Sequence, residues 1–111
     1  MSTIENSREY KLSNETLFFA ALNFNDTLSK IIYFENLTLK SMKILKIENA
    51  CGCTSAFVSD SIVNAMDSVP IQIFYIPSKS NDSGNVLKYI TIRSNAKIPF
   101  VNLIITGNIK K

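Results

Sequence analysis

The strongest constraint on this chain is a series of short, β-prone apolar runs separated by turn residues. The runs are rich in Ile, Val, Phe, Tyr and Thr, the residues that strands favour. Asn, Asp, Ser and Pro occupy the breaks, as in the loop at 82–85 (DSGN). The pattern predicts strands at 17–22, 28–36, 44–50, 69–76, 87–94 and 100–107, and a weaker strand within 56–62.

About seven short strands with regular turns are typical of a β-sandwich. The best helix candidate, residues 60–66 (DSIVNAM), is too short to change the class. We therefore predict an all-β chain, an immunoglobulin-like antiparallel β-sandwich. The length of 111 residues fits one domain. Residues 1–15 are polar and lack helical periodicity, so we expect there a flexible N-terminal arm that becomes ordered only near its end, and the sandwich at 16–111.

The composition argues against several functions. The chain has no histidine, which removes the commonest general base and the commonest metal ligand. It has a net charge of +3 and only two arginines, so a nucleic-acid partner is not expected. No catalytic constellation or phosphate-binding loop stands out. We expect no enzyme activity, no cofactor and no resident metal.

The sequence gives little information about the compartment. It has no run of 18 apolar residues, so a membrane-spanning helix is not expected. The polar residues 1–10 do not resemble a secretory signal. This start fits a cytoplasmic protein, and it fits equally an exported protein whose signal has been removed.

Three predicted strands, at 69–76, 86–92 and 100–105, are apolar on both faces in places. Antiparallel sheets usually leave one face to water. Loops and the N-terminal arm could cover the second face. Alternatively, an exposed apolar face could meet a protein partner or a second copy, as a monomer or a weak homodimer. For that alternative the candidate residues are Phe74, Ile76, Leu103 and Ile105.

The only unusual chemical feature is the motif Cys51-Gly52-Cys53-Thr54. In an extended strand the Cα atoms of residues i and i+2 lie roughly 6.5–7 Å apart, at or beyond the limit for a disulfide. Gly52 could relax the backbone and bring the sulfurs together. Three interpretations stay open: two packed thiols, a short-ring disulfide, or a thiolate pair for a soft metal such as Cu(I).

The surroundings of the motif resemble a bacterial family, the domain of unknown function number 1573. The resemblance covers residues 17–110. It rests on an aromatic-x-Asn turn at 34–36, an apolar strand that leads into Cys-Gly-Cys-Thr, and a closing Gly-Asn at 107–108. Two positions where the family usually has Gly hold Ala20 and Thr38 here.

The resemblance implies an immunoglobulin-like sandwich and export to the periplasm or cell surface, often as a lipoprotein. It implies no activity. We therefore expect a non-enzymatic binding or structural module of the bacterial envelope that recognises a protein or envelope component through a sheet face or an edge strand. The alternative is a thiol-based role at Cys51 and Cys53, supported by Gly52 and Thr54: Cu(I) binding or disulfide chemistry.

Overall fold

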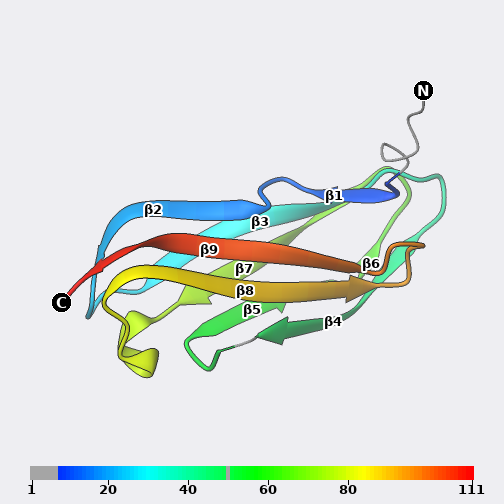
Figure 1. The fold of residues 1–111 in the computed structure, drawn as a ribbon. Coiled ribbons are helices and arrows are strands. Elements are labelled where there is room, and N and C mark those ends of the chain that lie inside the picture. Colours follow the sequence, from blue (N-terminus) through cyan, green and yellow to red (C-terminus); the bar gives the residue numbers. More distant parts are fainter. Residues whose placement is uncertain (1–7, 50) are drawn as a thin grey trace.

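The computed structural model describes residues 8–49 and 51–111, and it forms two packed β-sheets (Figure 1). The first sheet has four strands in the order β1-β3-β7-β5, and the second has five in the order β2-β9-β8-β4-β6. The strands are β1 (Tyr10–Leu12), β2 (Thr16–Asn23), β3 (Leu28–Asn36), β4 (Met42–Asn49), β5 (Thr54–Val58), β6 (Ile62–Val63), β7 (Ser68–Tyr75), β8 (Gly84–Ser94) and β9 (Phe100–Lys110). A 3-10 turn, η2 (Pro77–Ser80), connects β7 to β8.

The core lies between the sheets and is built from alternate residues of each strand. In β3 and β7 the buried side chains recur every second residue, because successive side chains point to opposite faces. Strands β8 and β9 supply the facing layer. The side chains with the least exposure are Tyr10, Ile32, Phe34, Val63, Ile71, Ile73, Tyr75, Ile90, Ile92, Leu103 and Ile105. The predicted β-sandwich is confirmed.

The first ordered strand differs from the prediction. Residues Tyr10 and Leu12 are buried, Tyr10 stacks on Phe34, and β1 pairs with β3. The expectation of a flexible arm up to residue 15 is therefore wrong for residues 10–12, whose short apolar alternation was hidden among polar neighbours. Residues 1–7 of that arm lie outside the described part of the chain.

The chain changes sheets between β1 and β2. Strand β1 belongs to the four-stranded sheet, whereas β2 runs parallel to β9 in the five-stranded one. All the other strand pairs within the described residues are antiparallel, so this parallel pair is the departure from a simple antiparallel sandwich. The segment at 60–66 contains β6 and a turn rather than a helix.

A buried amide connects the end of β3 to the turn beside β6. The Asn36 side chain is 1% exposed, and its Nδ2 donates to the carbonyls of Lys40 and Val63 at 2.7 and 3.0 Å. Its Oδ1 accepts from the backbone N–H and the hydroxyl of Thr38. Every polar atom of this side chain is thus paired, which buried amides require. The aromatic-x-Asn turn has a structural explanation.

Gly107 allows β2 and β9 to approach each other closely. A Cβ atom at this position would lie 2.1 Å from the carbonyl oxygen of Phe19 and 2.5 Å from its ring. No side chain larger than hydrogen fits without moving the β2 backbone. The Gly of the closing Gly-Asn motif is therefore needed for packing.

We predict that Gly107→Ala destabilises the fold by about 2–4 kcal/mol, because it forces the parallel β2-β9 pair apart. The matched control is Gly52→Ala, since a Cβ there meets nothing within 4 Å and Gly52 is not among the residues with positive φ. Urea unfolding of both variants measures the difference. Equal unfolding midpoints would contradict the packing role of Gly107.

Candidate functional site

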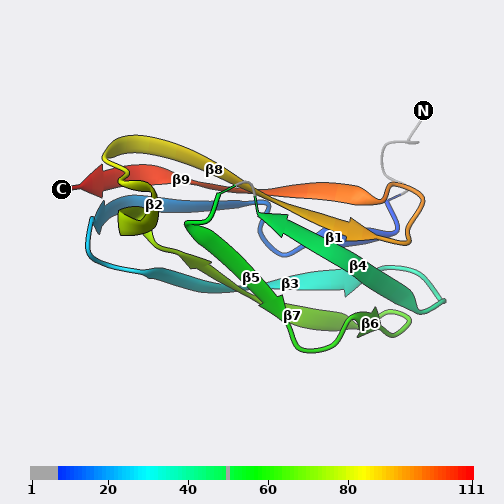
Figure 2. The ribbon, with the colours of Figure 1, turned by 90° about the horizontal axis from the view of Figure 1, so that it is seen from below.

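The Cys-Gly-Cys-Thr motif is the crossover from one sheet to the other. Strand β4 of the five-stranded sheet ends at Asn49, and β5 of the four-stranded sheet begins at Thr54 (Figure 2). The sulfurs of Cys51 and Cys53 are joined in a disulfide, with their Cα atoms 5.1 Å apart. This separation is shorter than in an extended strand, so the backbone turns here, as Gly52 was expected to allow.

Backbone hydrogen bonds hold this turn against β7. The carbonyl of Cys51 accepts from the N–H of Thr54 at 3.2 Å, and the carbonyl of Cys53 accepts from the N–H of Ile76 at 2.8 Å. The Thr54 hydroxyl also donates to the Cys51 carbonyl at 3.2 Å. Cys53 is buried, Cys51 is half-buried and Gly52 is exposed. The turn therefore fixes where β5 starts and presents one edge of the disulfide to solvent.

The disulfide bears on the three interpretations of the motif. A bonded pair of sulfurs offers no thiolate, so metal binding would first require reduction. Among the residues that the structure describes, no group of three or more His, Cys, Asp or Glu side chains is placed to hold a metal ion. The motif is thus a cross-linked turn in this structure.

The outer face of the four-stranded sheet is uncharged over its central part. This outer face consists of the outward-pointing residues of β3, β7 and β5: Ser29, Ile31, Tyr33, Pro70, Gln72, Phe74, Ser55 and Phe57. None of them carries a charge. Glu35, the next outward residue of β3, lies opposite Lys11 at the far end of the sheet. By contrast, the outer side of the five-stranded sheet carries Lys46, Glu48 and Arg93.

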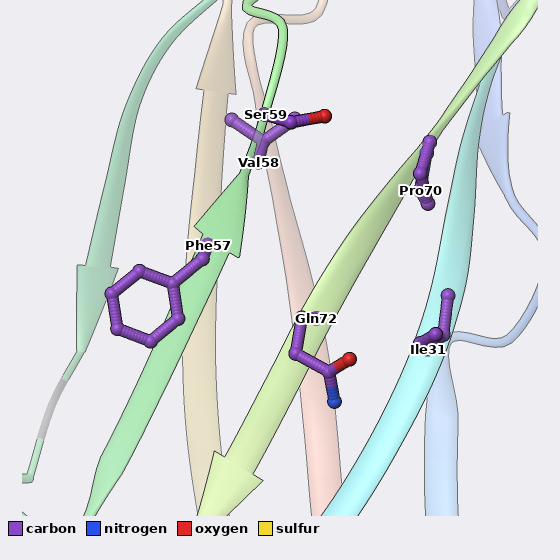
Figure 3. Close-up of a pocket in the computed structure, with 6 residues that line it drawn as sticks. All are labelled: Ile31, Phe57, Val58, Ser59, Pro70 and Gln72. Atoms are coloured by element: carbon purple, nitrogen blue, oxygen red, sulfur yellow. The ribbon is translucent and has the colours of Figure 1, made fainter.

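The exposed apolar groups on this outer face surround a shallow pocket of about 280 Å³. Figure 3 shows its lining across three neighbouring strands, with Ile31 on β3, Pro70 and Gln72 on β7, and Phe57 on β5. Ile31 is 53% exposed and Phe57 is 60% exposed. The Phe57 ring packs edge-on against Phe74, with centroids 6.0 Å apart. Large apolar side chains are therefore held in place on a face that meets water.

The structure separates the four residues predicted to form an interaction face. Phe74 is half-buried on the outer face of the four-stranded sheet, and Ile76, also half-buried, directly follows β7. Leu103 and Ile105 have no exposed surface and lie in the core beneath the other sheet. Their assignment to an exposed face is wrong, because Asn102, Thr106 and Asn108 take the outward side of β9 and the alternate residues, with Leu103 and Ile105 among them, face the core.

The sequence analysis missed Ile31, Tyr33, Pro70 and Phe57. A signal was present: the alternate residues of β3, β7 and β5 are uncharged on three strands at once. This signal is visible only when the pairing of the strands is known. Lys30 also made it hard to tell which side of β3 faces outward. Its position falls on the inward side of the strand, although its side chain is exposed.

A polar cluster closes the η2 end of the sandwich. The Asp82 carboxylate accepts hydrogen bonds from the hydroxyls of Tyr75 and Ser80, and Lys88 Nζ lies 3.2 Å from its other oxygen. Burial acts to raise the pKa of Asp82, but the hydrogen bonds from Ser80, Tyr75 and Lys88 outweigh it and lower the pKa. Burial and the bond to Asp82 raise the pKa of Tyr75. Every member of this cluster is paired, so its geometry indicates that the cluster stabilises the fold.

Comparison with known proteins identifies the family. A family model described as a protein of unknown function, DUF1573, matches residues 10–109. The chain belongs to this family. The match begins at the first residue of β1 and includes the crossover turn, Asn36 and Gly107. A comparison with curated protein sequences finds no match.

Solved structures support the fold. A protein of unknown function from Porphyromonas gingivalis W83 superposes with a TM-score of 0.79 at 15% identity, over 89% of this chain and 46% of that one. This chain thus spans about half the length of that relative. The PapD-like domain 7 of human CEP192 gives 0.69 at 9% identity, covering 93% and 86%. The periplasmic chaperone SfaE gives 0.64 at 8% identity, covering 92% and 58%. At these identities the likeness establishes an immunoglobulin-like, PapD-like fold alone.

Among the described residues, no helix has the length and apolar character needed to cross a bilayer.

We predict that Asp82→Asn costs about 1–3 kcal/mol of unfolding free energy at pH 7, because it removes the charge from three hydrogen bonds. Because the folded pKa lies below the unfolded one, the stabilisation is complete above about pH 4 and is lost as the pH falls through the folded value. Urea unfolding between roughly pH 2 and 7 tests this. The control Asp26→Asn alters an exposed carboxylate outside the cluster. A stability difference between Asp82→Asn and the parent that stays constant down to pH 2 would contradict the prediction.

Proposed function

We propose that this chain is a non-enzymatic binding module of the bacterial envelope that recognises a protein partner through the outer face of the four-stranded sheet. The observation that carries the proposal is the uncharged, partly aromatic character of this face around Ile31 and Phe57. The centres of protein interfaces are depleted of charged residues and enriched in aromatic ones. Ile31, Phe57 and Phe74 meet that description, and Gln72 supplies a central polar group.

The sandwich gives this face rigidity. Strand β7 is hydrogen-bonded on both sides, and its inward residues Ile71 and Ile73 have no exposed surface. The outward side chains of β7 are therefore fixed in direction, which lowers the conformational entropy that binding would otherwise cost. A rigid apolar face with one shallow pocket suits an apolar side chain of a protein partner better than a small polar substrate.

An envelope location is part of the proposal. It is supported by the disulfide, since disulfides persist in oxidising compartments such as the periplasm. The similarity of fold to SfaE, a periplasmic chaperone, is in keeping with it. A lipid anchor in a longer form of the chain would be compatible with the same location.

The proposal predicts site-specific cross-linking from the outer face of the four-stranded sheet. A photo-reactive phenylalanine analogue at position 74, expressed in the organism that encodes the chain, should form an adduct with a partner protein. Ile31→Lys combined with Phe57→Lys should reduce the adduct at least about tenfold, because a lysine in the desolvated centre of an interface is strongly unfavourable.

The matched control for these variants is Leu87→Lys, which alters a side chain of similar exposure, 52% against 53% for Ile31, on the other sheet. Circular dichroism checks that each variant is folded. Equal loss of the adduct with Leu87→Lys, or no loss with the Ile31 and Phe57 changes, would overturn the proposal.

A thiol-based role is a second candidate, and the disulfide at the crossover, whose Cys51 side is partly exposed, favours it. Two electrons and two protons from an external dithiol would reduce the Cys51–Cys53 disulfide to two thiols. The external dithiol would itself be oxidised to a disulfide. A ring that closes only three residues constrains the unfolded chain little, so we expect reduction to cost no more than about 1.5 kcal/mol of stability.

The measurement for this candidate is urea unfolding with and without dithiothreitol, followed by Cu(I) titration of the reduced chain. A thiol-based function requires that one Cu(I) ion binds per chain and that binding is lost when both Cys51→Ser and Cys53→Ser are present. If the reduced chain binds no Cu(I) and no cellular dithiol reduces the disulfide, this candidate is wrong.

A further inference from the structure

Strand β5 has a free edge with unpaired backbone groups. It pairs with β7 on one side only, and the pairs Cys53–Ile76, Ser55–Phe74 and Phe57–Gln72 are the hydrogen-bonded ones. In an antiparallel ladder the residues between such pairs direct their N–H and C=O groups the other way. The free edge is therefore formed by Thr54, Ala56 and Val58.

The crossover turn decides which of these edge groups remain available. The N–H of Thr54 is already bonded to the carbonyl of Cys51. The free edge thus offers two donors, the N–H groups of Ala56 and Val58, and three acceptors, the carbonyls of Thr54, Ala56 and Val58. No strand among residues 8–49 and 51–111 pairs with this edge.

The other sheet edges are better protected. Strand β1 has three residues and carries Lys11, and β6 has only two residues. Strand β2 is long and uncharged, but a register shift between Phe19 and Leu22 interrupts its regularity. Bulges, charges and short length are the features that guard natural edges against pairing. Strand β5 has five residues (TSAFV), no charge, no proline and an unbroken register.

We propose that β5 pairs antiparallel with β5 of a second copy of this chain, about a two-fold axis that places Ala56 opposite Ala56. In this register the Ala56 N–H groups donate to the Ala56 carbonyls of the opposite copy. Each Val58 N–H donates to the Thr54 carbonyl of the other copy. Every free donor of the edge finds an acceptor, and the occupied Thr54 N–H is not required.

The side chains also fit this register. Each Phe57 lies opposite Ser55 of the second copy, so a large residue faces a small one. Strand β5 contains no charged residue. Although each chain has a net charge of +3, no like charges lie opposite each other along the two paired strands. The two four-stranded sheets join, and their uncharged outer faces become continuous. This inference concerns the chain alone and does not depend on the proposed partner.

The test is sedimentation equilibrium of the purified chain from roughly micromolar to millimolar concentration, a range suited to a small interface. We expect the mass to rise from 12.4 kDa toward twice that value. Ala56→Pro removes one edge donor per copy and leaves the β5-β7 ladder intact, because the Ala56 N–H does not point at β7. It should weaken the dimer at least about tenfold.

Two charge variants test the register and do not rely on proline. Ser55→Glu with Phe57→Glu places like charges opposite each other across the two-fold axis and should dissociate the dimer. Ser55→Glu with Phe57→Lys is the matched control, since it places opposite charges there and should keep the dimer. Thermal unfolding confirms that each variant is folded.

Hydrogen exchange gives an independent readout. The amides of Ala56 and Val58 should become protected as concentration rises, whereas those of Ser55 and Phe57 should be protected at all concentrations. A chain that stays monomeric throughout, or a dimer that Ala56→Pro and the Glu pair leave unchanged, overturns the proposal. Cross-linking of position 74 to a different protein is expected whether or not the chain dimerises. The test of the dimer and the test of the proposed function can therefore fail separately.

Discussion

The hydrogen bond from the Ile76 N–H to the Cys53 carbonyl sets the alternation of the whole β5 strand. Once Cys53 is paired with Ile76, Ser55 and Phe57 must also bond to β7, and Ala56 and Val58 must face the open edge. The same alternation directs the Phe57 side chain outward, beside Phe74. The crossover turn therefore controls both the exposed aromatic face and the free edge groups.

The cysteine motif and the surface chemistry are thus two parts of one arrangement. The disulfide and Gly52 shorten the path between sheets, and the Thr54 N–H closes the turn on Cys51. A one-residue slip at this turn would exchange the two sides of β5, so that Phe57 would point into the core and Ala56 outward. The turn is better understood as a register device than as a reactive centre, although its exposed side leaves disulfide chemistry open to test.

Three residues of the motifs on which the family resemblance was based have packing explanations. The buried Asn36 amide donates to the carbonyls of Lys40 and Val63, and Gly107 lets two parallel strands approach. Cys53 is buried at the start of β5. None of these residues lines the pocket on the outer face. These three residues therefore serve the scaffold, and the pocket on the outer face is lined by other residues.

The sequence by itself determined the all-β class, the positions of most strands and the placement of the cysteine motif after an apolar strand. These follow from local signals: β propensity, two-residue alternation and turn residues, which act over a few neighbours. It did not determine that Tyr10 and Leu12 belong to the core, or that Ile31 and Phe57 point outward. Where a strand is apolar on both faces, only pairing with its neighbours decides which face is buried, and those neighbours come from distant parts of the chain. The tertiary structure therefore decided the candidate surface.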